Sequence, residues 1–110
     1  MHADLPTEIT KHLPDGYQPS QGVWLVLPET DTVRDGITTV NSWLRAEDWY
    51  PKLFQDVIWF GDDGTGNMFG WRLKQQKAIL WNPEDGETPW KEGNVKYLWQ
   101  FVLNGYKDAS

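Results

Sequence analysis

The spacing of hydrophobic and polar residues divides the chain into predicted strands and helices. Continuous apolar runs bounded by glycine, proline or polar residues are typical of strands, whereas apolar residues three or four positions apart are typical of one helix face. The predicted strands are residues 23–27, 57–60, 68–71 and 78–81. The predicted helices are residues 5–13, a segment capped at Thr30 or Asp31 and reaching Leu44, and residues 95–104. The apolar face of the second helix is Val33, Ile37, Val40 and Leu44, with Trp43 beside it. The apolar stripe of the last helix is Val95, Leu98, Val102 and Tyr106, widened by Trp99 and Phe101. Strands and crossover helices do not alternate regularly in this order of elements. The order therefore predicts an α+β domain with a twisted antiparallel sheet of about four strands flanked by helices.

Capping and breaking residues set the expected ends of these elements. Pro14 ends the first helix, because proline cannot continue the hydrogen-bond ladder. Gly36 falls inside the second predicted helix and weakens it by about 1 kcal/mol relative to alanine. Asn94 is the expected N-cap of the last helix and Gly105 its expected end. Residues 82–86 contain Asn-Pro and Asp-Gly and predict a turn.

The central segment of the chain is interpreted as strand, tight polar turn, strand. Residues 57–60 are β-branched or aromatic, which suits a buried strand. Residues 61–67 contain three glycines, two aspartates and an asparagine, types that tolerate positive φ or hydrogen-bond their own backbone. The apolar pattern restarts at residue 68. The glycines let the backbone reverse sharply and leave the two aspartates near the tip.

Composition narrows the class of protein. With 110 residues the chain is long enough for one domain over 1–110, whose ends at 1–4 and 107–110 we expect to be frayed. Eight tryptophans supply much of the core, and half-exposed ones serve binding surfaces. A net charge of −6 argues against nucleic-acid binding and is compatible with a basic partner, although the same charge also keeps a small domain soluble. Without cysteine, a signal peptide or an apolar span, we predict a cytoplasmic protein that does not bind membranes.

The turn offers three candidate chemistries, each weighed against a structural role. Asp62 and Asp63 are paired carboxylates, but neighbours on a strand point to opposite faces, and turn aspartates usually bond local amides. A calcium loop would need alternating acidic ligands and a closing glutamate, which the segment lacks. The glycine spacing is a poor nucleotide fingerprint, because no helix follows it and flanking carboxylates repel phosphate.

Other charged residues give no catalytic constellation. His2 and His12 are the only histidines, and neither has the surroundings of a relay or of a metal site. Arg72, Lys74 and Lys77 form a small positive patch at one hairpin, which is typical of a solvated tip that discourages edge pairing. We therefore predict no catalytic residue, no metal and no cofactor.

The central segment, Val57-Ile58-Trp59-Phe60-Gly61-Asp62-Asp63-Gly64-Thr65-Gly66-Asn67-Met68-Phe69-Gly70, resembles the signature of the SUKH superfamily. That group includes the Smi and Knr cell-wall regulators and many bacterial immunity proteins. Further matches in the same order are residues 5–9, 25–29, 79–83 and 95–104. The chain departs from the family pattern in its short first helix, in Asp15-Gly16-Tyr17 where the family has Asn-Gly-Gly, and in Asn82 where it often has Asp.

The resemblance implies a helix-flanked antiparallel sheet without conserved enzymatic machinery. Bacterial members are typically immunity proteins that neutralise a polymorphic toxin, often a nuclease, and other members are adaptors. The expected structural residues of the motif are Gly61, Asp62, Asp63, Gly64, Gly66, Asn67 and Trp81. The expected partner contacts, chosen as acidic and aromatic loop residues, are Trp49, Tyr50, Asp62, Asp63, Glu84, Asp85 and Trp90.

Three functions follow as hypotheses. The first is an immunity protein that blocks a basic toxin domain by steric and electrostatic means. The second is a cytoplasmic adaptor or regulator of an endogenous protein. The third is a small metal-dependent enzyme. The sequence leaves the partner's identity, the contact surface and the oligomeric state open.

Overall fold

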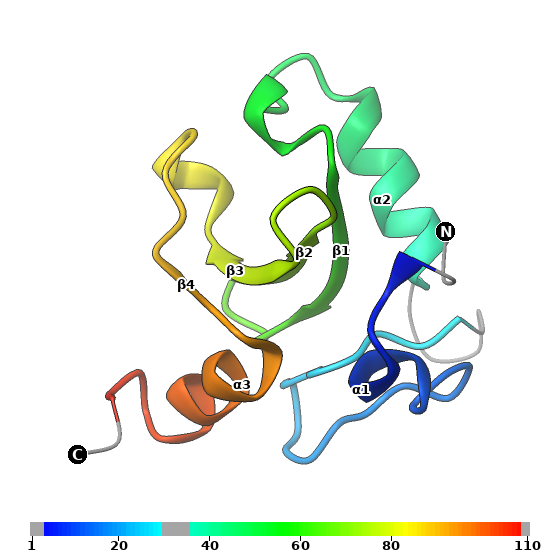
Figure 1. Cartoon of the computed structure of the whole chain (residues 1–110), viewed down its shortest axis with the longest axis vertical. Coiled ribbons are helices and arrows are strands. Elements are labelled where there is room, and N and C mark those ends of the chain that lie inside the picture. The colour runs from blue at the N-terminus through cyan, green and yellow to red at the C-terminus, as the bar shows by residue number, and fades with distance from the viewer. Residues whose placement is uncertain (1–3, 30–35, 109–110) are drawn as a thin grey trace.

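Four strands pair in an antiparallel meander, in the order β1-β2-β3-β4 (Figure 1). The computed structural model describes residues 4–29 and 36–108. Within them the strands are β1 Val57–Asp62, β2 Met68–Arg72, β3 Lys77–Trp81 and β4 Lys91–Gly93. The helices are α1 Thr7–Thr10, α2 Ile37–Ala46 and α3 Val95–Leu103, with short 3-10 helices at Lys52–Phe54 and Pro83–Asp85. The predicted α+β class and antiparallel sheet are confirmed, and the radius of gyration of 12.9 Å is that of a single compact domain.

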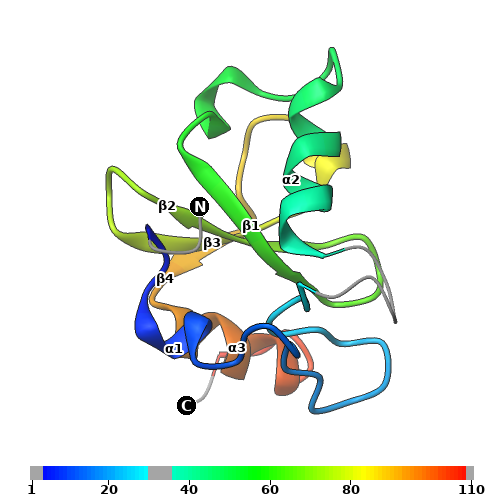
Figure 2. The same ribbon diagram turned by 90° about the vertical axis from the view of Figure 1, so that its right-hand side faces the viewer.

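The sheet is covered on both faces, which explains why β1 is buried along its whole length and why β2 and β3 are buried in their interiors. Along β1, Ile58 and Phe60 face one side, whereas Val57 and Trp59 face the other. Figure 2 shows α1 and α3 against one face and α2 against the opposite face. All six residues of β1 are buried, because neither face of this strand meets solvent.

The larger core lies between the sheet and the layer of α1 and α3. It takes apolar side chains from the N-terminal segment, from the sheet face and from the stripe of α3 that the sequence indicates. Fully buried members at 0% exposure include Ile9, Val26, Leu27, Phe60, Phe69, Leu80, Val95 and Leu98. The predicted helical stripe of α3 is confirmed by this packing.

The smaller core, on the α2 side, is built from aromatic rings. The rings of Trp59 and Trp81 stack with centroids 4.9 Å apart, and Phe54 packs edge-on to Trp81 at 5.0 Å. Both indole N–H groups are satisfied: that of Trp59 donates to the Tyr50 hydroxyl at 2.8 Å, and that of Trp81 donates to the Gly86 carbonyl at 2.9 Å. Two large side chains can therefore be buried here without an unpaired polar atom.

The predicted strand at 23–27 is wrong, and β4 was missed. Residues 24–27 are buried and extended, but they touch the edge of β1 only at isolated points, where Trp24 pairs with Asp62 and the Leu27 N–H donates to the Phe60 carbonyl. On its other edge, β1 pairs with β2 through a register shift between Trp59 and Gly61. The hydrophobic pattern of the sequence does not predict β4, because Lys91–Gly93 contains no apolar residue.

The first two helices are displaced or shortened relative to their predicted bounds. Helix α1 ends at Thr10, and turns continue the chain to residue 15. Gly36 is the N-cap of α2 with extended backbone, so the predicted cost of an interior glycine does not arise. The expected caps Thr30 and Asp31 lie outside the described residues.

The C-terminal helix follows its predicted signals. The Asn94 side chain accepts a hydrogen bond from the Tyr97 N–H at 2.7 Å, and Gly105 follows the helix with φ of +72°. Within the expected frayed end at 107–110, the Asp108 carboxylate accepts hydrogen bonds from the Tyr97 hydroxyl and from Lys91, and the fraying itself stays a prediction. Residues 1–3 and 109–110 of the predicted frayed ends lie outside the described part of the chain, whereas Asp4 and Lys107 are described and exposed. No helix in that described part is both long enough and apolar enough for a membrane crossing.

Candidate partner-binding surface

The turn between β1 and β2 is organised by Asp63, whose side chain is nearly buried at 4% exposure. Its Oδ1 accepts from the backbone N–H groups of Thr65 and Asn67 at 2.9 and 3.2 Å, and its Oδ2 accepts from the Tyr106 hydroxyl at 2.6 Å. Burial opposes ionisation, but the hydrogen bonds from Tyr106, Thr65 and Asn67 outweigh it and hold the pKa of Asp63 below its usual value. This carboxylate is therefore an acceptor that shapes the turn.

Asp62 also bonds within the turn, as expected for turn aspartates. Its Oδ1 accepts from the Gly64 N–H at 3.0 Å, and its backbone exchanges two hydrogen bonds with Trp24 at 2.8 and 2.9 Å. The side chain is 9% exposed. Asp62 and Asp63, expected among the partner contacts, thus present little surface, in keeping with their structural role in the motif.

The motif glycines serve two different purposes. Gly64 and Gly66 have φ of +83° and +106°, as their predicted role in a sharp reversal requires. Gly61 instead permits close packing, since a Cβ there would lie 2.5 Å from the Trp24 carbonyl oxygen and 2.7 Å from that of Leu25. The predicted contribution of Gly61 to the reversal is therefore wrong.

The motif turn also holds the next turn of the chain, at residues 83–86. The Asn82 amide donates to the Asn67 side-chain oxygen at 3.0 Å, and the Asn82 side-chain oxygen accepts from the Glu84 N–H at 2.9 Å. Together with the bond from Trp81 to Gly86, these contacts fix the turn that carries Glu84. Asn67 and Trp81 thus have the structural role expected of motif residues.

A groove of about 500 Å³ lies between α2 and the motif turn. Its α2 wall is apolar and includes the ring of Trp43, which is 56% exposed. Met68 and Pro83 supply apolar surface from the sheet side, and Asp62 stands at the rim formed by the turn. The lining of the groove is therefore mainly apolar.

A second hollow of about 330 Å³ adjoins the groove and shares Pro83 with it. Its other lining residues are Trp49, Glu84 and Gly86. Trp49 is 49% exposed, and its ring meets that of Trp43 edge-on with centroids 6.4 Å apart. We call the groove, the hollow and this tryptophan pair the aromatic-acidic surface.

The structure assigns the remaining predicted contacts to other places. Tyr50 is only partly exposed, and its hydroxyl donates to the Phe54 carbonyl at 2.7 Å while accepting from Trp59; burial raises the pKa of Tyr50. Trp90 is exposed, but it stacks on Tyr106 at 5.3 Å, beside α3. Of the seven expected contacts, only Trp49 and Glu84 line one hollow. Asp85 is exposed on the same turn as Glu84.

Sequence reasoning missed Trp43 and Met68 as surface residues. Trp43 lies next to the buried stripe of α2, immediately before Leu44, so it was taken as a neighbour of the core. One residue of rotation, about 100° in a helix, directs its ring toward solvent. An aromatic residue displaced from the apolar stripe of an amphipathic helix was the available signal.

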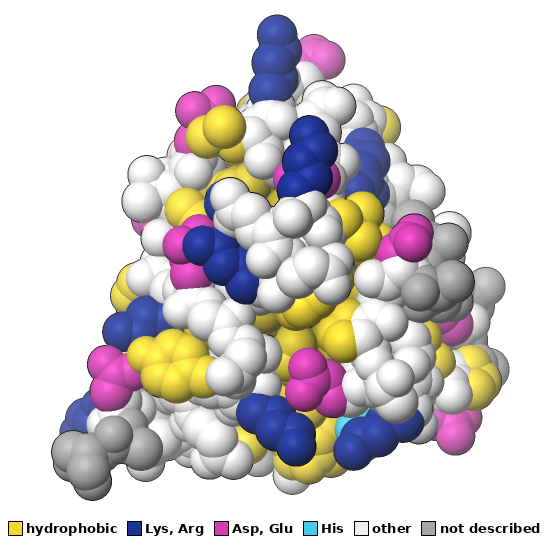
Figure 3. Space-filling model, viewed as in Figure 1, with side chains coloured by type: hydrophobic (Ala, Val, Ile, Leu, Met, Phe, Trp, Pro, Cys, Tyr) yellow, Lys and Arg dark blue, Asp and Glu magenta, His cyan; other side chains and the backbone are white. Residues whose placement is uncertain are grey.

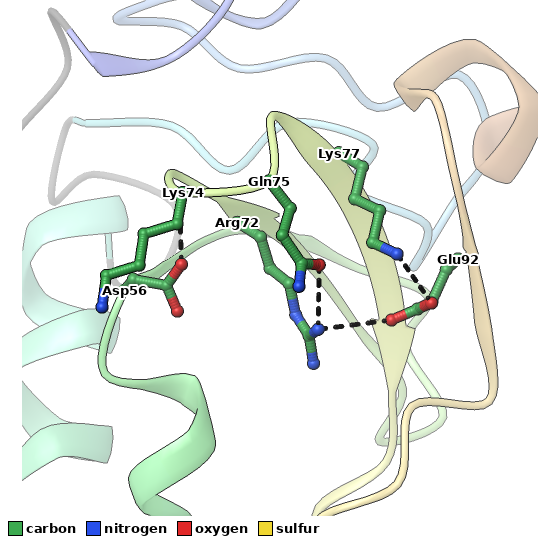
Figure 4. A network of polar contacts seen from close by, with 6 residues as sticks. All are labelled: Asp56, Arg72, Lys74, Gln75, Lys77 and Glu92. Atoms are coloured by element: carbon green, nitrogen blue, oxygen red, sulfur yellow. Dashed lines mark hydrogen bonds and ion pairs between the residues drawn. The ribbon is translucent and has the colours of Figure 1, made fainter.

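The predicted positive patch is a network of paired charges (Figure 4). Arg72 lies over the ring of Phe54, and its guanidinium is 3.4 Å from Glu92. Lys77 donates to the same carboxylate at 3.0 Å, and the Lys74 backbone N–H donates to Asp56 at 3.2 Å. On the face in Figure 3, basic and acidic side chains are interspersed. Arg72 and Lys77 therefore share the Glu92 carboxylate, whereas Lys74 contacts Asp56 through its backbone.

The described residues include no cluster of three or more histidine, aspartate or glutamate side chains able to hold a metal ion. His12 stacks on Tyr17 at 4.4 Å, and burial together with the nearby Lys11 lowers its pKa. Comparison with family profiles, curated proteins and solved structures finds no match to the chain.

Proposed function

We propose that this domain is a non-enzymatic, protein-binding immunity protein that blocks a basic toxin domain with its aromatic-acidic surface. The resemblance of the central segment to the SUKH signature supports this assignment at the level of sequence. We also place the protein in the cytoplasm, where it would meet such a toxin before export. The second hypothesis, an adaptor for an endogenous protein, would use the same surface.

The observation that carries the proposal is the side-by-side exposure of Trp43 and Trp49. Tryptophan is enriched among residues that dominate binding energy, because its large ring loses much water contact when a partner covers it. Here two rings meet edge-on and are each about half exposed. The exposed apolar surface of these two rings, next to the groove and the hollow, supports a docking function.

Charge supports a basic partner. The chain has a net charge of −6, and Glu84 and Asp85 lie exposed on the turn beside Trp49. A negative field accelerates encounter with a positive partner and weakens as salt screens it. We therefore expect the association rate to fall with ionic strength while the dissociation rate changes little.

The experiment is co-expression with the product of a neighbouring large, toxin-like gene, scored by growth and by co-purification. The double variant Trp43→Ala, Trp49→Ala should lose protection and weaken the complex at least about tenfold, since hot-spot residues contribute about 2 kcal/mol or more. Trp90→Ala is the matched control, because Trp90 is 45% exposed but lies outside the surface, and it should bind like the wild type.

Three outcomes would count against the proposal. Neither a complex nor protection in co-expression would remove the immunity function. Stable capture of an endogenous protein that requires Trp43 and Trp49, without any toxin-like partner, would favour the adaptor instead. Equal loss of binding in the Trp90 variant would show that a different surface is used.

A further inference from the structure

We propose that the hollow between Trp49 and Glu84 receives an arginine side chain of the partner. This inference rests on the proposed function, since it names the chemical group that anchors the basic partner. The hollow of about 330 Å³ has an aromatic wall from Trp49 and a carboxylate from Glu84, with Pro83 and Gly86 completing the lining. An aromatic face next to a carboxylate is the environment that a guanidinium recognises.

Arginine fits this hollow better than lysine because of its shape and hydration. The planar guanidinium stacks on an aromatic face and offers a fork of N–H donors to a carboxylate, and it is less strongly hydrated than an ammonium. Trp49 is 49% exposed and its ring meets that of Trp43 edge-on, so part of the residue packs against the domain while the rest is open to a partner. The stacking and the ion pair can therefore form together.

The walls of the hollow are fixed by contacts within the domain. Trp49 packs edge-on against Trp43, and the turn carrying Glu84 is held by the Asn82 cap and by the bond from Trp81 to Gly86. A site whose walls are ordered in advance loses little conformational freedom on binding. This is why a single side chain can bind measurably without the rest of the partner.

The neighbouring groove adds a requirement on the partner's sequence. It shares Pro83 with the hollow and is lined by Val40, Trp43, Leu44 and Met68 among others. An apolar side chain next to the arginine in the partner would lie in this groove. The anchoring segment is therefore an arginine adjacent to an apolar residue.

The test uses a blocked single amino acid as the probe. N-acetyl-arginine methylamide is titrated into the full chain, and the indole N–H signal of Trp49, assigned with Trp49→Phe, is followed by NMR. The matched neutral probe is N-acetyl-citrulline methylamide, which has nearly the same shape. We expect a saturating shift of the Trp49 signal with arginine and about three- to fivefold weaker binding of citrulline, since exposed cation–π contacts and ion pairs are modest.

Two variants separate a local contact from a general effect of charge. Glu84→Gln and Asp85→Asn each remove one negative charge from the same exposed turn, but only Glu84 lines the hollow. Glu84→Gln should weaken arginine binding about threefold or more, whereas Asp85→Asn should change it less than about twofold. Unchanged spectra elsewhere in both variants show that the fold is retained.

The inference is overturned if arginine and citrulline bind equally, if the Trp49 signal does not move, or if the two variants have the same effect. These outcomes are independent of the proposed function. Arginine binding without a toxin complex would remove the immunity role and leave the arginine site. A toxin complex without arginine binding would leave the immunity role and remove the site.

Discussion

The side-chain amide of Asn41 hydrogen-bonds both backbone groups of Trp59. Its Oδ1 accepts from the Trp59 N–H at 2.8 Å, and its Nδ2 donates to the Trp59 carbonyl at 2.8 Å and to that of Ile37 at 2.7 Å. Asn41 projects from α2 and is completely buried. The amide thus occupies the place that a neighbouring strand would take on the outer edge of β1.

Arg45 extends this protection one turn further along α2. Its guanidinium donates to the Val57 carbonyl and to the Asn41 side-chain oxygen. At the other end of β1, Trp24 pairs with Asp62. Because side chains hydrogen-bond these backbone groups on the outer edge of β1, that edge is not available for pairing with a strand of another chain.

Asn41→Leu should lower the free energy of unfolding by about 2–5 kcal/mol, because two buried backbone groups of Trp59 lose their partners. Urea unfolding followed by tryptophan fluorescence measures this. Ser42→Ala, an exposed position on the same helix, is the control and should stay within about 0.5 kcal/mol of the wild type. A loss below 1 kcal/mol for Asn41→Leu would mean that other groups satisfy Trp59.

Asp63 should make stability depend on pH in the acid range. Its folded pKa lies below the ordinary 3.8, so its stabilisation is complete above pH 3.8 and is lost as the pH falls through the lower folded value. Asp63→Asn should be less stable than the wild type at neutral pH by about 2–4 kcal/mol, because charged hydrogen bonds are lost.

The diagnostic result for Asp63 is the pH dependence of that difference. Urea unfolding of both proteins from neutral pH downward should show the gap narrowing below pH 3.8. Asp85→Asn, on an exposed turn, is the control and should keep a small, constant difference from the wild type. A gap for Asp63→Asn that stays constant at all pH values would show that its ionisation does not stabilise the fold.

Gly64→Ala should be more damaging than Gly22→Ala, although both glycines have φ of +83°. The unfavourable backbone conformation costs alanine about 1–2 kcal/mol at either position. At Gly64 the added Cβ would also lie 2.4 Å from the Gly22 carbonyl oxygen, whereas at Gly22 it would meet nothing. We expect Gly64→Ala to lower the free energy of unfolding by about 1–3 kcal/mol more than Gly22→Ala does. Thermal unfolding of the two variants measures the difference, and equal losses would rule out the close contact.

Trp43 and Trp49 should matter less for folding than the buried Trp59. Replacing either with alanine should lower the free energy of unfolding by about 1–2 kcal/mol, because each residue is only about half buried and the edge-on pair adds about 0.5–1.5 kcal/mol to that burial. Trp59→Ala, in the buried aromatic core, should cost about 3–5 kcal/mol. Chemical unfolding compares the three variants. A large loss of stability from either surface tryptophan would assign it to the core and weaken the proposed docking role.

The sequence by itself determined the features that depend on neighbouring residues. The strand, turn, strand pattern around residues 57–71 is local, because glycine and aspartate fix the reversal and the flanking apolar runs fix the strands. Asn94 and Gly105 likewise mark the ends of α3 through their own backbone and side-chain chemistry. Apolar spacing on α3 was sufficient to identify its buried face.

Only the tertiary structure decided which distant segments meet. Residues 24–27 have strand composition, yet they lie along β1 without joining the sheet, whereas the polar β4 pairs with β3 because its neighbours position it there. The same holds for the surface: Trp49 and Glu84 are 35 residues apart in the numbering of the chain and share one hollow, whereas Trp90 packs elsewhere. Composition records which side chains are present, but long-range packing decides which of them lie together and which remain exposed.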